Sequence, residues 1–142
     1  MKVEKNLWKT TPDGKDIFLY RITNESGAYV ELGSVGAGIV SIVVPDKEGK
    51  LADVVIGYDD PMSYFGDGPC AGKCPGRYAN RIAKGHFTLD GKEYTLPVNN
   101  ACNHLHGGPD AFQNQVWESR VEGEAVEFMY FSEDGEAGYP GN

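Results

Sequence analysis

Short apolar runs separated by turn residues recur along the chain, and each run predicts a β-strand. In residues 28–32 every second side chain is apolar, which gives the strand one apolar face. Residues 39–44 are mostly β-branched and predict a second strand, which Pro45 ends. A third apolar run lies in residues 53–57. The turn cluster at 46–49 separates these last two runs and predicts that they form a hairpin.

The clearest hairpin signal lies in residues 86–96, HFTLDGKEYTL. Asp90-Gly91 suits a two-residue turn in which both residues adopt a positive φ. That turn places Phe87 directly opposite Tyr94, so we expect the two rings to form a cross-strand pair on one face. Such a pair contributes roughly 0.2–1 kcal/mol to the stability of a hairpin.

Helical signals are few. Asp60 and Pro61 predict one helical turn, with Asp60 as its cap and Pro61 in its first position. No segment sustains a 3.6-residue periodicity, and a further strand is expected within residues 125–131, before the turn at 133–135. The 19 glycines and 8 prolines fit a chain with many turns. Together these features predict an all-β fold, an antiparallel β-sandwich or part of one.

Length, charge and cysteine content narrow the class of protein. The 142 residues suffice for one domain with its own core. The net charge of −8 argues against nucleic acid and against an anionic membrane as partners, because both attract clustered Lys and Arg. The first 20 residues hold no apolar run typical of a signal peptide or membrane span, so we expect a cytoplasmic location. Cys70, Cys74 and Cys102 are too few for a disulfide framework and fit a reducing compartment.

Two histidines stand close together in NACNHLHGG, residues 100–108. In an extended strand His104 and His106 would share one face, where two imidazoles offer ligands to zinc or iron. A third ligand is poorly provided, because Cys102 is too close in the chain and the spacing of the other cysteines does not fit a structural zinc site. The alternative is that one histidine is exposed and the other hydrogen-bonds the backbone. We therefore assign no metal ligands.

A second polar cluster lies in GRYANRIAKG, residues 76–85. Glycines bracket this segment and a hairpin follows it, so we expect a loop or a short irregular strand. There Asn80 and Arg81 would present fixed hydrogen-bond donors, and the five donors of a guanidinium suit oxygen atoms in a half-buried site. The alternative is that Arg77 and Arg81 form structural salt bridges with acidic residues.

Arginine, asparagine and histidine beside loose aromatic residues are typical of a sugar site. Sugars offer hydroxyl edges to polar groups and apolar faces to rings. The aromatic candidates for the walls of such a site are Tyr64, Phe65, Phe112 and Trp117.

The same segments carry a family resemblance. GRYANRIAKGHFTLDGKEYTLPVNN and, after it, NHLHGGPDAFQNQVW resemble the aldose 1-epimerases, the galactose mutarotases. The segment GAGIVSIVVPDKEGKLADVVIGYDD and the closing DGEAGYPGN are also similar to that family, so the resemblance covers essentially the whole chain. It implies a large antiparallel β-sandwich, of which residues 1–142 would form the N-terminal portion of a single domain.

The resemblance also implies roles for individual residues. Arg81 matches the arginine that hydrogen-bonds the sugar hydroxyls. His106 matches the histidine of the sugar site, where it would act as a catalytic residue that polarises the substrate or only positions it. Asn80 would shape this loop and contribute to sugar binding. With these roles, we expect Arg81 and His106 to meet in a single hollow shaped for a pyranose. His104 falls at a position that the family motif leaves open, and Arg77 is expected to be structural.

The activity that the resemblance implies is interconversion of the α and β anomers of free aldoses such as galactose or glucose. A base takes the proton of the C1 hydroxyl and an acid protonates the ring oxygen, so that the ring opens and recloses without a metal or organic cofactor. The family's general acid, a second histidine, and its general base, a glutamate, have no match among these residues. We therefore expect the chain alone to be inactive, and to self-associate through uncovered sheet edges.

Two other functions stay open. A non-catalytic carbohydrate-binding sandwich would keep Arg81 and His106 and lack the acid and base. A hexose-phosphate 1-epimerase would need more cations near the pocket, for which Lys73, Arg77 and Lys84 are available, although the acidic balance of the chain weighs against it. We rank the mutarotase interpretation above both, and above a metal-binding protein.

Overall fold

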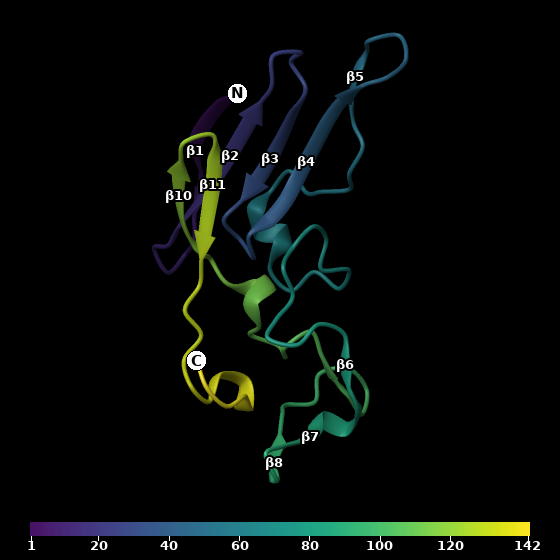
Figure 1. Cartoon of the computed structure of the whole chain (residues 1–142), viewed down its shortest axis with the longest axis vertical. Coiled ribbons are helices and arrows are strands. Elements are labelled where there is room, and N and C mark those ends of the chain that lie inside the picture. The colour runs from purple at the N-terminus through teal and green to yellow at the C-terminus, as the bar shows by residue number, and fades with distance from the viewer.

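The computed structural model describes residues 1–142 and consists of strands joined by turns and four short 3-10 helices. Its largest element is an antiparallel sheet of five strands, which lie side by side in chain order (Figure 1). These strands are β1 (Lys2–Thr10), β2 (Asp16–Thr23), β3 (Tyr29–Gly33), β4 (Gly38–Pro45) and β5 (Leu51–Asp53).

The other strands form three antiparallel pairs. They are β6 (Arg81–Ile82) with β9 (His104–Leu105), β7 (His86–Leu89) with β8 (Lys92–Thr95), and β10 (Glu118–Glu122) with β11 (Ala125–Met129). The 3-10 helices are η1 (Pro61–Tyr64), η2 (Ala83–Gly85), η3 (Phe112–Asn114) and η4 (Glu136–Gly138). None of the helical segments has the length and apolar composition that a membrane-crossing helix needs.

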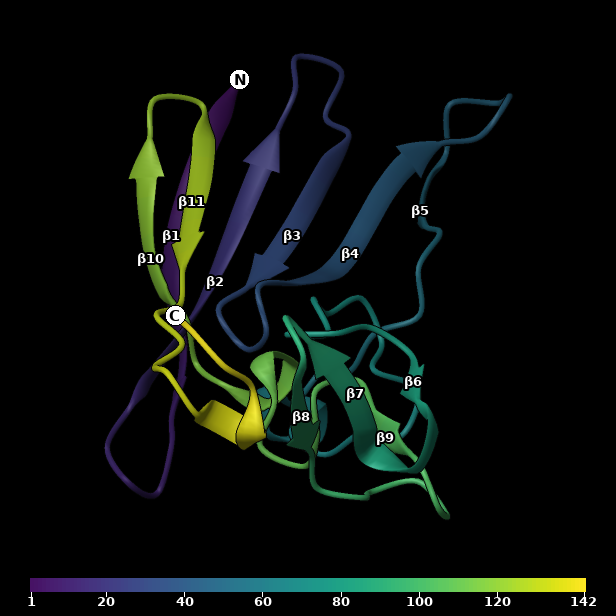
Figure 2. The same cartoon turned by 60° about the horizontal axis from the view of Figure 1, so that its bottom comes forward.

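The hairpin β10–β11 forms a second layer over β1 and β2 (Figures 1 and 2). Tyr20 of β2 is completely buried there. Its ring meets that of Phe128 edge-on, with 5.8 Å between centroids, and its hydroxyl donates to Ser119 Oγ over 2.8 Å. Burial of an aromatic ring together with a satisfied hydroxyl ties the two layers together. The molecule is therefore all-β with a sandwich architecture, as the strand pattern predicts.

A second cluster of buried side chains joins the sheet to the segment that follows it. Ile17, Val35 and Tyr64 are almost wholly enclosed, and Trp8 packs edge-on against Tyr64. Tyr64 belongs to η1, the helical turn that the sequence predicts at this place. Its cap is also confirmed, because Asp60 Oδ1 accepts from the Met62 N–H over 3.0 Å.

Several predicted strands are confirmed. Residues 28–32 correspond to β3 and residues 39–44 to β4, while 125–131 correspond to the shorter β11. In the hairpin β7–β8 the register is the expected one, and the rings of Phe87 and Tyr94 stack with 5.1 Å between centroids. The φ angles of Asp90 and Gly91 are both positive, at 51° and 76°.

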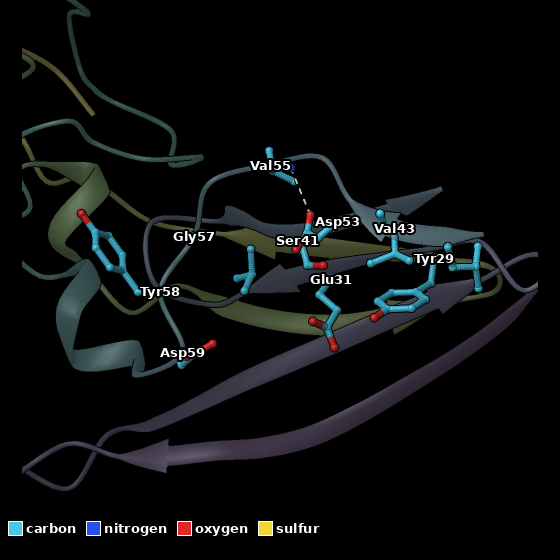
Figure 3. A pocket seen from close by; sticks show the side chains of 12 residues that line it. Tyr29, Glu31, Ser41, Val43, Asp53, Val55, Gly57, Tyr58 and Asp59 are labelled. Atoms are coloured by element: carbon cyan, nitrogen blue, oxygen red, sulfur yellow. Dashed lines mark hydrogen bonds between the residues drawn. The ribbon is translucent and has the colours of Figure 1, made fainter. Parts of the chain in front are cut away.

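The strand expected at 53–57 is wrong. The partner of β4 is β5, which ends at Asp53, and beyond it Val54 and Ile56 are 65% and 86% exposed. The reason is the Asp53 carboxylate, which accepts from the backbone N–H groups of Ile42 and Val55 over 3.1 and 3.0 Å (Figure 3). Since a side chain occupies these donors, only one further backbone hydrogen bond joins the two segments, from the Val54 N–H to the Ile42 carbonyl, and the ladder then ends.

Candidate functional site

The strands β6 and β9 bring the two polar motifs together. Arg81 lies opposite Leu105, and Ile82 lies opposite His104. Asn80 and His106 continue this pairing by one position, because the His106 N–H donates to the Asn80 carbonyl over 2.9 Å. The three residues that the motifs single out, Asn80, Arg81 and His106, are thus neighbours in space.

Asn80 and His106 make a second contact that involves the imidazole. The Asn80 N–H donates to His106 Nδ1 over 3.0 Å. A neutral imidazole that accepts at Nδ1 carries its proton on Nε2, so His106 presents an N–H donor. Nε2 has no hydrogen-bond partner within the chain, and the donor is available to a ligand.

This contact depends on an uncommon backbone conformation. Asn80 and His106 have φ angles of 65° and 52°, in the left-handed region that L-residues other than glycine seldom adopt. Each such residue costs on the order of 1–3 kcal/mol, and strain of this kind gathers at binding and catalytic sites. Gln113, itself buried, helps to hold the turn because its Nε2 donates to the His106 carbonyl over 3.0 Å.

The guanidinium of Arg81 is held by two amide oxygens. Nε donates to Asn100 Oδ1 over 2.9 Å and Nη1 donates to Asn80 Oδ1 over 3.1 Å. Neither Arg81 nor Arg77 forms an ion pair with a carboxylate, so the salt-bridge alternative for these arginines is wrong. Arg81 therefore keeps an unneutralised charge and further donors at an exposed position.

Arg77 has the structural role that the sequence predicts. Its Nε donates to Ser132 Oγ over 2.7 Å, and its terminal nitrogens donate to the carbonyls of Ser132, Glu133 and Pro140. These hydrogen bonds attach the segment after β11 to the loop before β6. Because Nε and both terminal nitrogens of Arg77 donate to groups of the protein, few of its N–H groups remain for a ligand.

His104 is a core residue. It is completely buried, its Nδ1 lies 2.7 Å from the Pro97 carbonyl and its Nε2 lies 2.7 Å from the Tyr139 hydroxyl. Because a carbonyl can only accept, Nδ1 donates, and Nε2 accepts from Tyr139. Burial also raises the pKa of the Tyr139 hydroxyl, which keeps it protonated as a donor.

The expectation that His104 and His106 share a face is wrong. β9 ends at Leu105, and the left-handed φ of His106 turns its imidazole toward Asn80 while that of His104 points into the core. Both nitrogens of His104 are occupied, so it has no lone pair for a metal. Nor does the chain hold a cluster of three or more His, Cys, Asp or Glu residues that could coordinate one.

Arg81 and His106 line different hollows. Arg81 borders a cavity of about 480 Å³ whose aromatic walls are Tyr78, Phe87 and Tyr139. His106 borders another of about 290 Å³, together with polar residues that include Gln113. None of the larger cavities is lined by both, so the single hollow expected from the sequence is not formed within this chain. The two side chains are instead connected through Asn80, which hydrogen-bonds to each.

The aromatic residues proposed as pocket walls lie elsewhere. Tyr64 and Phe65 pack in the core beneath the sheet. Phe112 and Trp117 pack edge-on against each other at 6.0 Å, and the Trp117 indole N–H donates to the Phe112 carbonyl over 2.8 Å. Tyr78 and Tyr139 belong to the segments GRYANRIAKG and DGEAGYPGN, but the sequence analysis does not propose them as walls, and the fold brings Tyr139 beside Arg81.

The largest cavity, of about 580 Å³, lies away from these motifs, between β3, β4 and the segment from 51 to 59 (Figure 3). Two of its three carboxylates, those of Glu31 and Asp53, already have structural partners, and the third belongs to Asp59. Glu31 pairs with Arg21 over 2.8 Å, and Asp53 accepts from backbone N–H groups. None of the motif residues lines it, so its size does not make it the candidate site.

The sequence of residues 19–142 matches the aldose 1-epimerase family. The chain belongs to the aldose 1-epimerase family. A galactose mutarotase from Bos taurus is 49% identical over 112 residues, which are 79% of this chain and 33% of the relative. An aldose 1-epimerase from Escherichia coli K12 is 36% identical over 92% of this chain and 38% of the relative. This family member thus spans about a third of the length of the curated relatives it matches.

Solved structures agree with this assignment. A galactose 1-epimerase from Lactobacillus acidophilus superposes with a TM-score of 0.84 at 25% identity, over 99% of this chain and 42% of that protein. An aldose epimerase homologue from C. elegans gives a TM-score of 0.81 at 35% identity, over 87% and 38%. The antiparallel β-sandwich of the galactose mutarotase type, expected from the resemblance, is therefore confirmed for this aldose 1-epimerase family chain.

Proposed function

We propose that this chain supplies part of the sugar site of an aldose 1-epimerase, which interconverts the α and β anomers of free aldoses such as galactose or glucose. The observation that carries the proposal is the hydrogen bond from the Asn80 N–H to His106 Nδ1, because it leaves a donor at Nε2. Arg81, the residue after Asn80, adds N–H groups that donate to no atom of the chain. Donors of this kind complement the hydroxyl and ring oxygens of a sugar.

In the proposed mechanism these side chains bind and polarise the sugar. Arg81 and Asn80 hold hydroxyl groups, and the Nε2–H of His106 donates to an oxygen near the reacting centre. As a donor, His106 does not take the C1 proton in this tautomer. The proton transfers fall to a second histidine as acid and a glutamate as base, each contributing about 10²–10⁴-fold. Since no counterpart of that pair is identified here, we propose that residues 1–142 form the N-terminal portion of a single sandwich domain.

A free sugar fits the charges around the site better than a sugar phosphate does. Of the three cations available to bind a phosphate, Lys73, Arg77 and Lys84, the first two already bind groups of the protein. Lys73 is buried in an ion pair with Asp67 and also donates to the Tyr64 carbonyl, and Arg77 is spent on backbone carbonyls. We propose a monosaccharide as the partner of this site. We also propose a cytoplasmic location, because the free thiols of the chain fit a reducing compartment.

The experiment compares sugars and measures both binding and catalysis. The 142-residue chain is titrated with glucose, galactose and glucose 6-phosphate, and polarimetry follows mutarotation of α-glucose in its presence. We expect the free sugars to bind at least as tightly as the phosphate, and the polarimetric rate to equal that of buffer. Tighter binding of glucose 6-phosphate would favour a hexose-phosphate epimerase. Absence of sugar binding would refute the proposed site, and mutarotation above the buffer rate would refute the assignment of acid and base.

A further inference from the structure

The way in which Arg81 is held points to a residue to which the sequence analysis assigns no role, Asn100. Arg81 is exposed, and an exposed arginine side chain ordinarily samples many rotamers. Here two of its nitrogens are fixed, Nε by Asn100 and Nη1 by Asn80. Both acceptors are neutral amide oxygens. Nη2 donates to no group within the chain.

Asn100 is itself held firmly. It lies in a tight turn in which its N–H donates to the Asn103 carbonyl over 3.0 Å and the Asn103 N–H donates back over 2.9 Å. The Asn103 side chain accepts from the Lys84 N–H at 3.2 Å. On the other side, the side-chain amide of Asn99 makes two hydrogen bonds to the peptide groups of Leu105, at 2.7 and 3.0 Å. The backbone that carries the oxygen contacted by Arg81 is therefore attached to η2 and β9.

We propose that Asn100 is a positioning residue that orients the Arg81 guanidinium and leaves its Nη2 donors and its charge available to a ligand. A carboxylate at this place would hold Arg81 more strongly but would also neutralise it. An amide oxygen satisfies one N–H and leaves the positive charge unpaired. Fixing the side chain before binding reduces the conformational entropy that binding must remove. The identity of the ligand as a sugar rests on the proposed function, whereas the orientation of Arg81 does not.

The first test measures the order of Arg81 directly. In ¹⁵N-labelled chain, exchange of the Arg81 Nε–H with water is compared among wild type, Asn100→Leu, Asn100→Asp and the control Asn6→Leu, which makes the same change at an exposed position of β1. We expect Asn100→Leu to speed exchange about tenfold, because the hydrogen bond to Nε is lost. Asn100→Asp keeps an acceptor and should keep the slow exchange, and Asn6→Leu should behave as wild type.

Wild-type exchange in Asn100→Leu would overturn the proposal. If Asn100→Leu does not fold, Asn100→Asp still decides, because loss of the slow Nε–H exchange in that folded variant would also overturn it.

The second test adds galactose. Asn100→Leu should weaken galactose binding about tenfold, because Arg81 must then be ordered by the ligand. Asn100→Asp should also weaken galactose binding, because the carboxylate pairs the charge of Arg81, but it should retain slow Nε–H exchange. Weaker binding with unchanged exchange is not expected of a merely structural residue. Wild-type affinity in both variants would overturn the assigned role. If wild type binds no galactose but Asn100→Leu still speeds the exchange of the Arg81 Nε–H, the orientation of Arg81 by Asn100 is supported and the proposed function fails.

Discussion

The backbone N–H of Asn80 donates to Nδ1 of His106 over 3.0 Å, and the backbone N–H of His106 donates to the carbonyl of Asn80 over 2.9 Å. This reciprocal contact decides which nitrogen of the imidazole carries the proton. It also connects the two family motifs, which are 26 residues apart in the chain. Each prediction about ligand binding depends on it.

Replacing His106 by Asn removes the Nε2–H donor. A hydrogen bond to a polar or charged partner is worth roughly 1–3 kcal/mol, so we expect affinity for galactose or glucose to fall at least about fivefold. Titration of the variant by NMR or calorimetry measures the change. The matched control is His86→Asn on β7, which lies outside the site and should bind as wild type does. Equal affinities of the His106 variant and wild type would remove His106 from the site.

Replacing His104 by Leu should affect stability. The change leaves the Pro97 carbonyl and the Tyr139 hydroxyl without their partner in a buried place, at a cost of roughly 2–4 kcal/mol in the free energy of unfolding. Urea denaturation measures this cost. Tyr139→Phe removes one of the two hydrogen bonds and should cost less. A His104→Leu chain as stable as wild type would show that these hydrogen bonds do not support the fold.

Stability at alkaline pH should depend on Tyr130. Burial, together with a hydrogen bond to Glu136, raises the pKa of Tyr130 to about 12. Because this value lies above the unfolded value of about 10, the folded chain holds the proton more tightly, and the resulting stability is complete below about pH 10 and lost toward about pH 12. We expect the free energy of unfolding to fall over this interval, and to fall less in Tyr130→Phe. Identical alkaline profiles for the two chains would contradict the assignment.

The chain should self-associate. Phe131 and Ile56 are 70% and 86% exposed, and exposed apolar side chains next to open strand edges promote association. Sedimentation velocity should show species larger than a monomer, and Phe131→Glu should shift them toward the monomer. Lys47→Glu changes an exposed loop side chain and serves as the control. A wild-type chain that sediments only as a monomer would contradict this expectation.

Local signals explain which parts of the fold can be predicted from the sequence. The Asp90-Gly91 turn determines the register of β7–β8 by itself, and Asp60 caps its own helical turn. β1, β2 and β10 are missing from the sequence prediction, although each pairs with a strand next to it in the chain. β1 and β10 are mostly polar, so their apolar pattern is weak. The end of β5 at Asp53 depends instead on the fold, because there a carboxylate meets the backbone of another strand.

The site divides in the same way. The motifs single out Asn80, Arg81 and His106, and the fold makes them neighbours. They do not reveal that Asn100 holds Arg81, because that contact depends on the tight turn at residues 100–103, which the sequence analysis does not predict. The separate hollows of Arg81 and His106 follow from positive φ angles at residues 80 and 106, which an expectation of extended strands does not include.

The central claim is that Arg81 and His106 serve one sugar molecule, and a single titration tests it most directly. Galactose is added to ¹⁵N-labelled chain while the side-chain signals of Arg81 and the imidazole nitrogens of His106 are followed together. Both sets of signals should move with one midpoint, and His106 should keep its proton on Nε2 throughout. Movement of one set without the other, or two different midpoints, would contradict this claim.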